Sequence, residues 1–240
     1  MPVPADPGEP VPAGELASTA LPGEGDADLP PDGIEGRGPW VPALLGPYLE
    51  RQLAELSGAA IRCSVEPDPG RGDDARAARR RQAELAVERM FGRRVVVTHR
   101  GDGKPGVAGN GVGISASHGA ALTLAVAGPG RVCCGVETIH ERTPGGWRGL
   151  LAAQFPLAEL IQRERGEELP LAATRVWGAV ECLRKLGWVL TGPVTLAEGG
   201  AAGWVLLQAG TVKIATFCTF LRDQPEPVIF TVLFEKDKNA

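Results

Sequence analysis

Apolar residues recur at spacings of three and four positions in several parts of the chain, and each such segment predicts a helix. These segments cover about residues 44–56, 73–91, 149–165 and 172–186. Shorter apolar runs, bounded by Gly, Pro or charged residues, predict strands instead. The runs cover about residues 61–65, 95–98, 112–117, 121–127, 132–139, 194–196, 204–208, 212–221 and 228–234. Helices and strands that mix along the chain before a final series of strands predict an α+β fold.

The first 36 residues differ from the rest in composition. They contain eight prolines, six glycines and eight of the 29 acidic residues, but none of the 25 Lys and Arg residues. Large apolar residues are also scarce in this segment, and their burial could not offset the entropy lost on folding. We therefore expect a disordered linker over 1–36 and a folded domain over 37–240. The linker is either a tether within a longer chain or an ordinary disordered tail. The folded part is then mildly basic, with four more basic than acidic residues.

The bulk features of the chain exclude several classes of protein. No apolar run reaches the roughly 18–20 residues that a membrane span needs, and the N-terminus lacks the pattern of a signal peptide. We therefore expect a cytoplasmic protein that binds no membrane. The five cysteines include no C-x-x-C pair, and the three histidines are not spaced as a zinc site requires. A transition-metal centre is therefore not expected.

Three residues in the second half of the chain have side chains that can act on a cation or a phosphate. Glu137 follows Gly135 at the end of a predicted strand, where a carboxylate can hold a cation and glycine lets a ligand approach closely. Glu181 and Lys185 are four residues apart on the helix predicted over 172–186, so they share one face of it. Taken singly, such features are also common on solvated surfaces.

A second group of residues could bind phosphate. Lys104 lies in a Gly-Lys-Pro turn, and Ser117 and His118 stand at the end of a predicted strand. Ammonium, hydroxyl and imidazole groups supply the donors that phosphate oxygens accept. The arginines of segment 76–81, among them Arg79, either join this site or form a solvated basic face. By itself, a single histidine would be interpreted as structural.

Taken in their order along the chain, these segments resemble the phosphopantetheinyl transferase superfamily. The signature of that family comprises a G-K/R-P turn, an S-H pair after a strand, a G-x-D strand end and a W/F-x-x-K-E-x-x-x-K helix. The resemblance covers about residues 72–220, and Glu137 and Glu181 lie 44 residues apart, which matches the family's usual spacing. Residues 155–159 are similar to the family's F-x-x-x-E segment.

The resemblance implies a fold and a set of site residues. The fold would have two pseudo-repeated α+β halves, about 37–128 and 129–240, with coenzyme A in the cleft between them. Glu137 and Glu181 would bind Mg²⁺, and Glu181 and Lys185 would act in catalysis. Lys104, Ser117 and His118 would contact the nucleotide phosphates, and Arg79 would support the nucleotide of coenzyme A. Other arginines of segment 76–81 are alternatives to Arg79.

The same resemblance implies an activity and a partner. The protein would transfer 4′-phosphopantetheine from coenzyme A to a serine of an apo acyl carrier protein, with Mg²⁺ as cofactor. Residues 216–230 resemble the last strands of the transferase domain that is integrated at the end of enediyne-type iterative polyketide synthases. This similarity implies a role in polyketide and antibiotic biosynthesis, with a carrier protein that could belong to the same synthase.

The chain departs from the family pattern at three positions. Glu137 stands where the family usually has Asp, Ile139 where some members have a second acidic ligand, and Val180 where the helix motif has Lys. These differences favour an alternative, a catalytically inactive relative that serves as a carrier-docking or structural module. A nucleic-acid binder using the arginines between 71 and 100 is a third hypothesis. It lacks interleaved aromatics and a known motif, and the net charge of −4 argues against it, so no nucleic acid is expected as a partner.

Overall fold

The computed structural model describes residues 40–235, apart from residues 69, 71, 100–104, 108–110, 189–191 and 223 and the side chains of Asp73 and His99. The linker predicted over 1–36 and the candidate phosphate ligand Lys104 lie outside the described residues. The described residues belong to one compact unit of the chain. They therefore suffice to show how most of the candidate site residues are arranged.

Five α-helices and ten strands occur among the described residues. The helices are α1 (Pro42–Ser57), α2 (Asp73–Phe91), α3 (Pro144–Leu151), α4 (Phe155–Arg165) and α5 (Leu169–Lys185), with a 3-10 turn η1 (Ala152–Gln154) after α3. The strands are β1 (Arg62–Pro67), β2 (Val97–His99), β3 (Pro105–Val107), β4 (Val112–Gly119), β5 (Leu122–Pro129), β6 (Val132–Thr138), β7 (Thr195–Leu196), β8 (Trp204–Ala209), β9 (Val212–Thr219) and β10 (Val228–Glu235). None of the described helices has the length and apolar character needed to cross a membrane.

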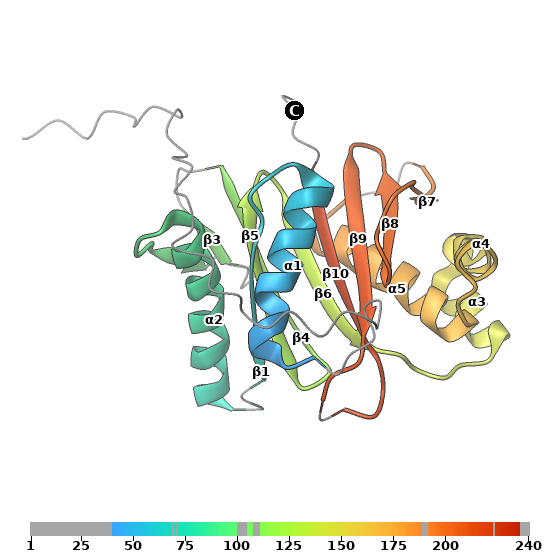
Figure 1. Cartoon of the computed structure of the whole chain (residues 1–240), viewed down its shortest axis with the longest axis horizontal. Helices are drawn as coiled ribbons and strands as arrows, with labels where there is room; N and C mark the ends of the chain where they lie inside the picture. Colours follow the sequence, from blue (N-terminus) through green and yellow to red (C-terminus); the bar gives the residue numbers. More distant parts are fainter. Residues whose placement is uncertain are drawn as a thin grey trace, which may run out of the picture. The chain divides into compact units, whose positions relative to one another are not determined.

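The strands form two larger antiparallel sheets and one small hairpin of β2 and β3. The first sheet has the order β1-β5-β4, and the second has the order β6-β10-β9-β8-β7. In both larger sheets, the strand that comes first in the chain pairs with the strand that comes last. That last strand also pairs with the strand directly before it in the chain, so β5 pairs with β1 and β4, and β10 pairs with β6 and β9. A helical segment follows the first strand in each case (Figure 1). This mixture of helices and antiparallel strands confirms the predicted α+β class.

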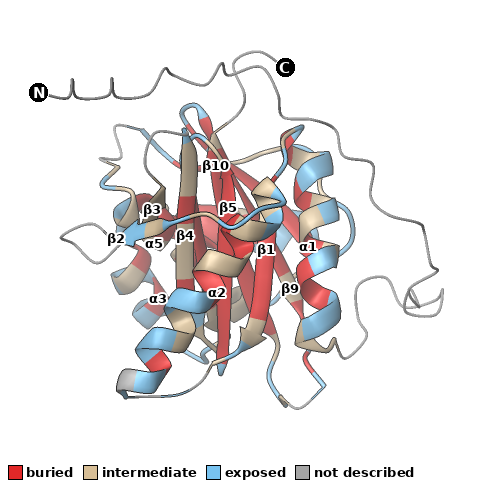
Figure 2. Ribbon diagram, turned by 90° about the vertical axis from the view of Figure 1, so that its left-hand side faces the viewer, coloured by how far each residue is buried: buried red, intermediate tan, exposed pale blue. Residues whose placement is uncertain are grey.

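The second sheet is covered by helices on both faces. Along β10, Phe230 and Phe234 belong to the core that includes α1, whereas Leu233 belongs to the core formed with α3, α4 and α5. Figure 1 shows α1 in front of this sheet and α5 behind it, and Figure 2 shows buried residues along the strands between helices. Because successive side chains of a strand point to opposite faces, burial on both faces requires a continuous apolar run such as that of β10.

The helix predicted over 149–165 was wrong in its extent, because the structure has two helices there. Helix α3 begins earlier, at Pro144, and the side chain of Thr143 caps it. The chain then breaks at Ala152, whose φ of 49° lies outside the α-helical region. Helix α4 starts anew with Pro156 in its first turn, where the missing N–H of proline leaves no hydrogen bond unmade. The apolar spacing continues across this break, so the pattern alone could not locate it.

Strands β4 and β6 lie against each other where the two larger sheets meet, although they belong to different sheets. The residues of β4 at this contact are small and alternate along the strand: Gly113, Ser115, Ser117 and Gly119. A Cβ atom added at Gly119 would overlap the carbonyl oxygen of Val136 in β6. The Oγ of Ser115 accepts a hydrogen bond from the backbone N of Cys134 at 3.1 Å. We call this line of contact the β4–β6 seam.

Candidate functional site

Lys185, the last residue of α5, reaches the β4–β6 seam. Its Nζ donates hydrogen bonds to Ser117 Oγ at 3.3 Å and to the backbone oxygen of Cys134 at 3.1 Å. The apolar face of α5, which includes Val176 and Leu183, packs on the second sheet and so brings the end of the helix to this position. One side chain therefore connects α5, β4 and β6.

Two carboxylates lie close to this lysine. Glu137 is half-buried near the end of β6, and burial raises its pKa above the usual value. The charges of Lys185 and His140 lower the pKa of Glu137, whereas the charge of Glu181 raises it further. The charge of Glu181 therefore disfavours the ionised form of Glu137, and a bound cation would offset this effect. Glu181 accepts a hydrogen bond from Arg184 Nη1 at 2.7 Å, one turn further along α5.

His118 stands on β4 next to the seam, and three charged residues act on it. Arg79 donates from Nε and Nη2 to the two carboxylate oxygens of Asp68, at 3.0 and 2.7 Å, which ties α2 to the end of β1. The pKa of His118 is lowered by partial burial and by the charges of Arg79 and Lys185, whereas the charge of Asp68 opposes this shift. His118 therefore lies in a mainly cationic environment, which suits an anionic ligand.

The structure brings together six of the seven candidate site residues through contacts and mutual electrostatic effects. They are Arg79, Ser117, His118, Glu137, Glu181 and Lys185. Lys104 is outside the described residues, although Pro105 directly after it begins β3. Ser117 is only 6% exposed, and its hydroxyl accepts a hydrogen bond from Lys185, a role that the sequence did not predict.

Sequence reasoning missed three residues near the site. Asp68 holds Arg79, Thr123 contacts His118, and the charge of His140 acts on Glu137. Asp68 and Thr123 have no signature of their own, because each is recognisable only once its partner is in place. His140 could have been found from its position three residues after Glu137, just beyond the end of β6.

The turn between β4 and β5 has a strained backbone, and hydrogen bonds from two other parts of the chain hold it in place. Its two residues, Ala120 and Ala121, have φ values of 52° and 53°. For residues other than glycine this left-handed conformation costs about 1–2 kcal/mol each, and such strain often occurs near functional sites. The backbone N of Asp68 donates to the oxygen of Ala121 at 2.7 Å, and the side-chain amide of Gln224 donates to the oxygen of Ala120. The turn thereby fixes the end of β4, where His118 lies.

The carboxylate pair fits a magnesium ion that shares its coordination with a ligand. Mg²⁺ is usually held by one or two carboxylates, together with substrate phosphates and water. The charge of Glu181 acts on Glu137, so these two carboxylates are the candidates for such a pair. Within the described residues no group of three or more His, Cys, Asp or Glu side chains could hold a metal ion. Additional oxygens would therefore have to come from the ligand and from water.

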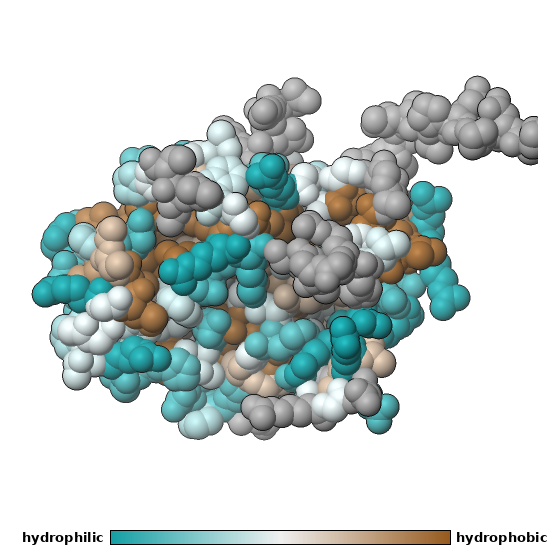
Figure 3. All heavy atoms as spheres, turned by 180° about the vertical axis from the view of Figure 1, so that it is seen from behind, coloured by the Kyte–Doolittle hydropathy of each residue, from teal (hydrophilic) through white to brown (hydrophobic). Residues whose placement is uncertain are grey.

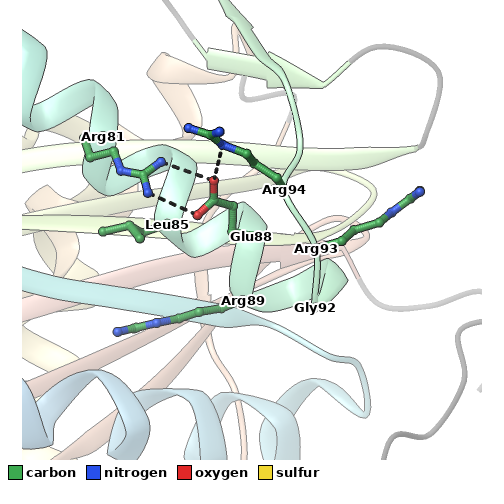
Figure 4. Close-up of a pocket in the computed structure, with 7 residues that line it drawn as sticks. All are labelled: Arg81, Leu85, Glu88, Arg89, Gly92, Arg93 and Arg94. Carbon is green, nitrogen blue, oxygen red and sulfur yellow. Dashed lines mark hydrogen bonds and ion pairs between the residues drawn. The ribbon is translucent and has the colours of Figure 1, made fainter.

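A separate hollow lies at the C-terminal end of α2 (Figure 4). Its lining consists of Arg81, Leu85, Glu88, Arg89, Gly92, Arg93 and Arg94. Glu88 accepts a hydrogen bond from Arg81 at 3.2 Å and pairs with Arg94 at 3.8 Å, while Arg89 donates to the backbone oxygen of Cys63. Figure 4 shows Arg93 pointing away from the others. Arg81 and Arg94 are already paired with Glu88, so their positive charge is partly offset.

The surface offers no single large apolar patch within the described residues. The large exposed apolar side chains there are Leu44, Val96 and Phe220, and they belong to different parts of the fold. Figure 3 shows apolar and hydrophilic residues interspersed over the back of the molecule. The site at the seam is therefore the best-defined candidate for function.

Comparison with known proteins does not add to this picture. Neither the scan against models of protein families nor the search of curated proteins finds a match to this chain. What the site can do must therefore be argued from its own residues.

Proposed function

We propose that this chain is a Mg²⁺-dependent phosphopantetheinyl transferase, which transfers 4′-phosphopantetheine from coenzyme A to a serine of an apo acyl carrier protein. The observation that carries this proposal is the contact between two motif segments that are 68 residues apart in sequence. Lys185 of the helix motif donates to Ser117 of the Ser-His pair, beside the strand that ends in Glu137. This contact joins two of the motif segments that resemble the family, and it supports the proposal.

The strand order also supports the proposal. The orders β1-β5-β4 and β6-β10-β9 follow the same scheme of pairing, each with a helical segment after its first strand. A fold of two pseudo-repeated halves would have this property. In such a fold the ligand would bind where the halves meet, and the β4–β6 seam is the line along which the two larger sheets touch.

The charges at the seam suit the phosphates of coenzyme A. Arg79, His118 and Lys185 surround one region and would act on the nucleotide phosphates, with Lys104 as a further candidate from the sequence. Glu137 and Glu181 would hold Mg²⁺ against the pyrophosphate. The ion would neutralise charge on the pyrophosphate as the phosphoryl group is transferred.

In the proposed reaction, the serine oxygen of the carrier attacks the β-phosphorus of coenzyme A. A bond forms between them as the bond from phosphorus to the oxygen of adenosine 3′,5′-bisphosphate breaks. Glu181 would accept the serine proton, directly or through water. Lys185 would offset the negative charge on the departing bisphosphate.

The carrier protein is expected to be acidic, as such proteins commonly are. Residues 37–240 have a small excess of basic side chains, which would favour the encounter modestly. The similarity of residues 216–230 to enediyne-type synthases suggests a polyketide carrier.

One observation favours the alternative of an inactive docking module. Glu181, the proposed base, is paired with Arg184 at 2.7 Å, and Val180 beside it is buried and apolar. The guanidinium of Arg184 thus occupies one carboxylate oxygen of Glu181, whereas a base needs an oxygen turned toward the serine. An inactive module would bind the carrier protein without modifying it.

Mass spectrometry of candidate apo carriers, incubated with the protein, coenzyme A and Mg²⁺, tests the proposal. We expect the carrier to gain the mass of phosphopantetheine, and EDTA to abolish this gain. Glu181→Gln removes both the proposed base and one metal charge, so transfer should fall at least a hundredfold, about the contribution of one acid–base group. Glu164→Gln on the exposed face of α4 is the matched control and should transfer normally. Undiminished transfer by Glu181→Gln, or in EDTA, would refute the mechanism, whereas carrier binding without transfer would favour the docking module.

A further inference from the structure

Thr123 is a buried polar residue with one notable contact. It lies on β5 directly opposite His118 of β4, and it is 0% exposed. Its Oγ1 stands 2.9 Å from Nδ1 of the His118 ring. The strained turn that follows β4, held by Asp68 and Gln224, keeps these two strand positions in register. The two side chains are therefore held opposite each other by the backbone of β4 and β5.

The direction of this hydrogen bond follows from the number of protons. Within the described residues, His118 is the only partner found for the side-chain hydroxyl of Thr123. If Nδ1 carried the ring proton, the hydroxyl would accept it, and the proton of the hydroxyl itself would be buried without an acceptor. If the hydroxyl donates to Nδ1, both groups are satisfied. Buried donors without acceptors are rare in native proteins, so the second arrangement is favoured.

We propose that Thr123 is a positioning residue that holds His118 as the neutral tautomer with its proton on Nε2. The ring nitrogen that Thr123 does not occupy then always presents a donor to a ligand. The groups that surround the ring are Arg79 from α2, Asp68 from the end of β1 and Lys185 from α5, and together with burial they lower its pKa. A donor with two cations in its surroundings suits a phosphate oxygen, such as that of a phosphate monoester.

The chemical class of the ligand rests on the proposed function. If the chain binds coenzyme A, the phosphate monoester is the 3′-phosphate on its ribose. Dephospho-coenzyme A lacks this group and keeps the rest of the molecule. The difference in binding between the two compounds therefore reports on the contact with the 3′-phosphate, which His118 would donate to, and not on the other contacts.

Nitrogen NMR of the histidine rings tests the tautomer without any ligand. Long-range proton–nitrogen spectra of the full chain, labelled with ¹⁵N and recorded at mildly alkaline pH, distinguish the two tautomers. The signals of His118 are identified by their loss in His118→Gln. We expect the Nε2–H form in the wild type and in Thr123→Ser, which keeps the hydroxyl. Thr123→Val should shift the ring toward the Nδ1–H form or a mixture of both.

Thr231→Val is the matched control for this experiment. Thr231 is also 0% exposed on a strand, but its Oγ1 has no hydrogen-bond partner within the described residues. Its replacement should leave the His118 spectrum unchanged. An Nδ1–H tautomer in the wild type would overturn the proposal even if Thr123→Val did not fold. An unchanged spectrum in folded Thr123→Val would overturn it as well.

Calorimetric titration with the two nucleotides tests the consequence for binding. Thr123→Val should weaken the binding of coenzyme A on the order of tenfold, while binding of dephospho-coenzyme A changes less than about twofold. Equal losses for both compounds would refute the link to the phosphate monoester. If the wild type binds neither compound, the proposed function fails, but the NMR result still decides the role of Thr123.

Discussion

Among single residues, Glu137 shows most clearly how the fold changes a side chain's chemistry. Its carboxylate is half-buried and close to Glu181, and both factors raise its pKa. The ionised form is therefore less stable in the folded protein than in the unfolded chain, and Lys185 and His140 offset this only in part. Such destabilisation is typical of a position that needs a cation or another ligand to be complete.

Glu137→Gln should therefore stabilise the protein in the absence of metal and ligand. Below the pKa of the unfolded chain both states are protonated, so the charge contributes nothing there. As the pH rises through that value and then through the raised pKa of the folded state, the wild type loses stability that the glutamine variant keeps. We expect a higher melting temperature for Glu137→Gln at neutral pH and nearly equal values near pH 4. A variant less stable than the wild type at neutral pH would contradict this account of Glu137.

Among the elements, β4 has the strictest requirements. Every second residue of β4 along the β4–β6 seam is small, in the order Gly, Ser, Ser, Gly, so the backbone of β6 can approach closely. The two serine hydroxyls accept hydrogen bonds from the backbone N of Cys134 and from Lys185 Nζ. An alternation of small residues is not a recognised strand signal, because it has neither the apolar period nor the bulk of a core strand. Its meaning becomes visible only when the facing strand is known.

Gly119→Ala should therefore destabilise the fold. The new Cβ would overlap the Val136 carbonyl oxygen, a backbone atom that cannot move without shifting β6. We expect a loss of about 1–3 kcal/mol in urea unfolding, typical of overpacking. Gly145→Ala is the control, because its Cβ meets nothing within 4 Å in helix α3. That variant should gain about 0.4–1 kcal/mol, and equal effects of the two substitutions would show that the seam is loosely packed.

At the scale of the whole molecule, the division of the chain remains a prediction. The composition of residues 1–36 indicates a linker that adds nothing to the folded domain. A protein that lacks these residues should therefore keep its melting temperature, measured by circular dichroism, and the rate of the proposed carrier modification. A decrease of several degrees would mean that the segment contributes to the fold. A slower transfer at unchanged stability would instead point to a role in meeting the carrier.

The sequence by itself determined the α+β class and most element positions. These follow from local preferences and from the period of the apolar residues, which differs between helices and strands. Errors arose where the apolar period continues through a backbone break, as at Ala152 between α3 and α4. The candidate site residues could be named from motif order, but the order alone did not show what each one contacts.

Only the tertiary structure decided which side chains meet. Arg175 is 1% exposed and pairs with Glu167 while it donates to the backbone of Thr216, although arginine usually indicates a surface position. In the same way, Ser117 receives a hydrogen bond from Lys185, and Thr123 contacts His118. These pairs depend on strand order and register, which are set by packing between distant segments, and no local pattern encodes them.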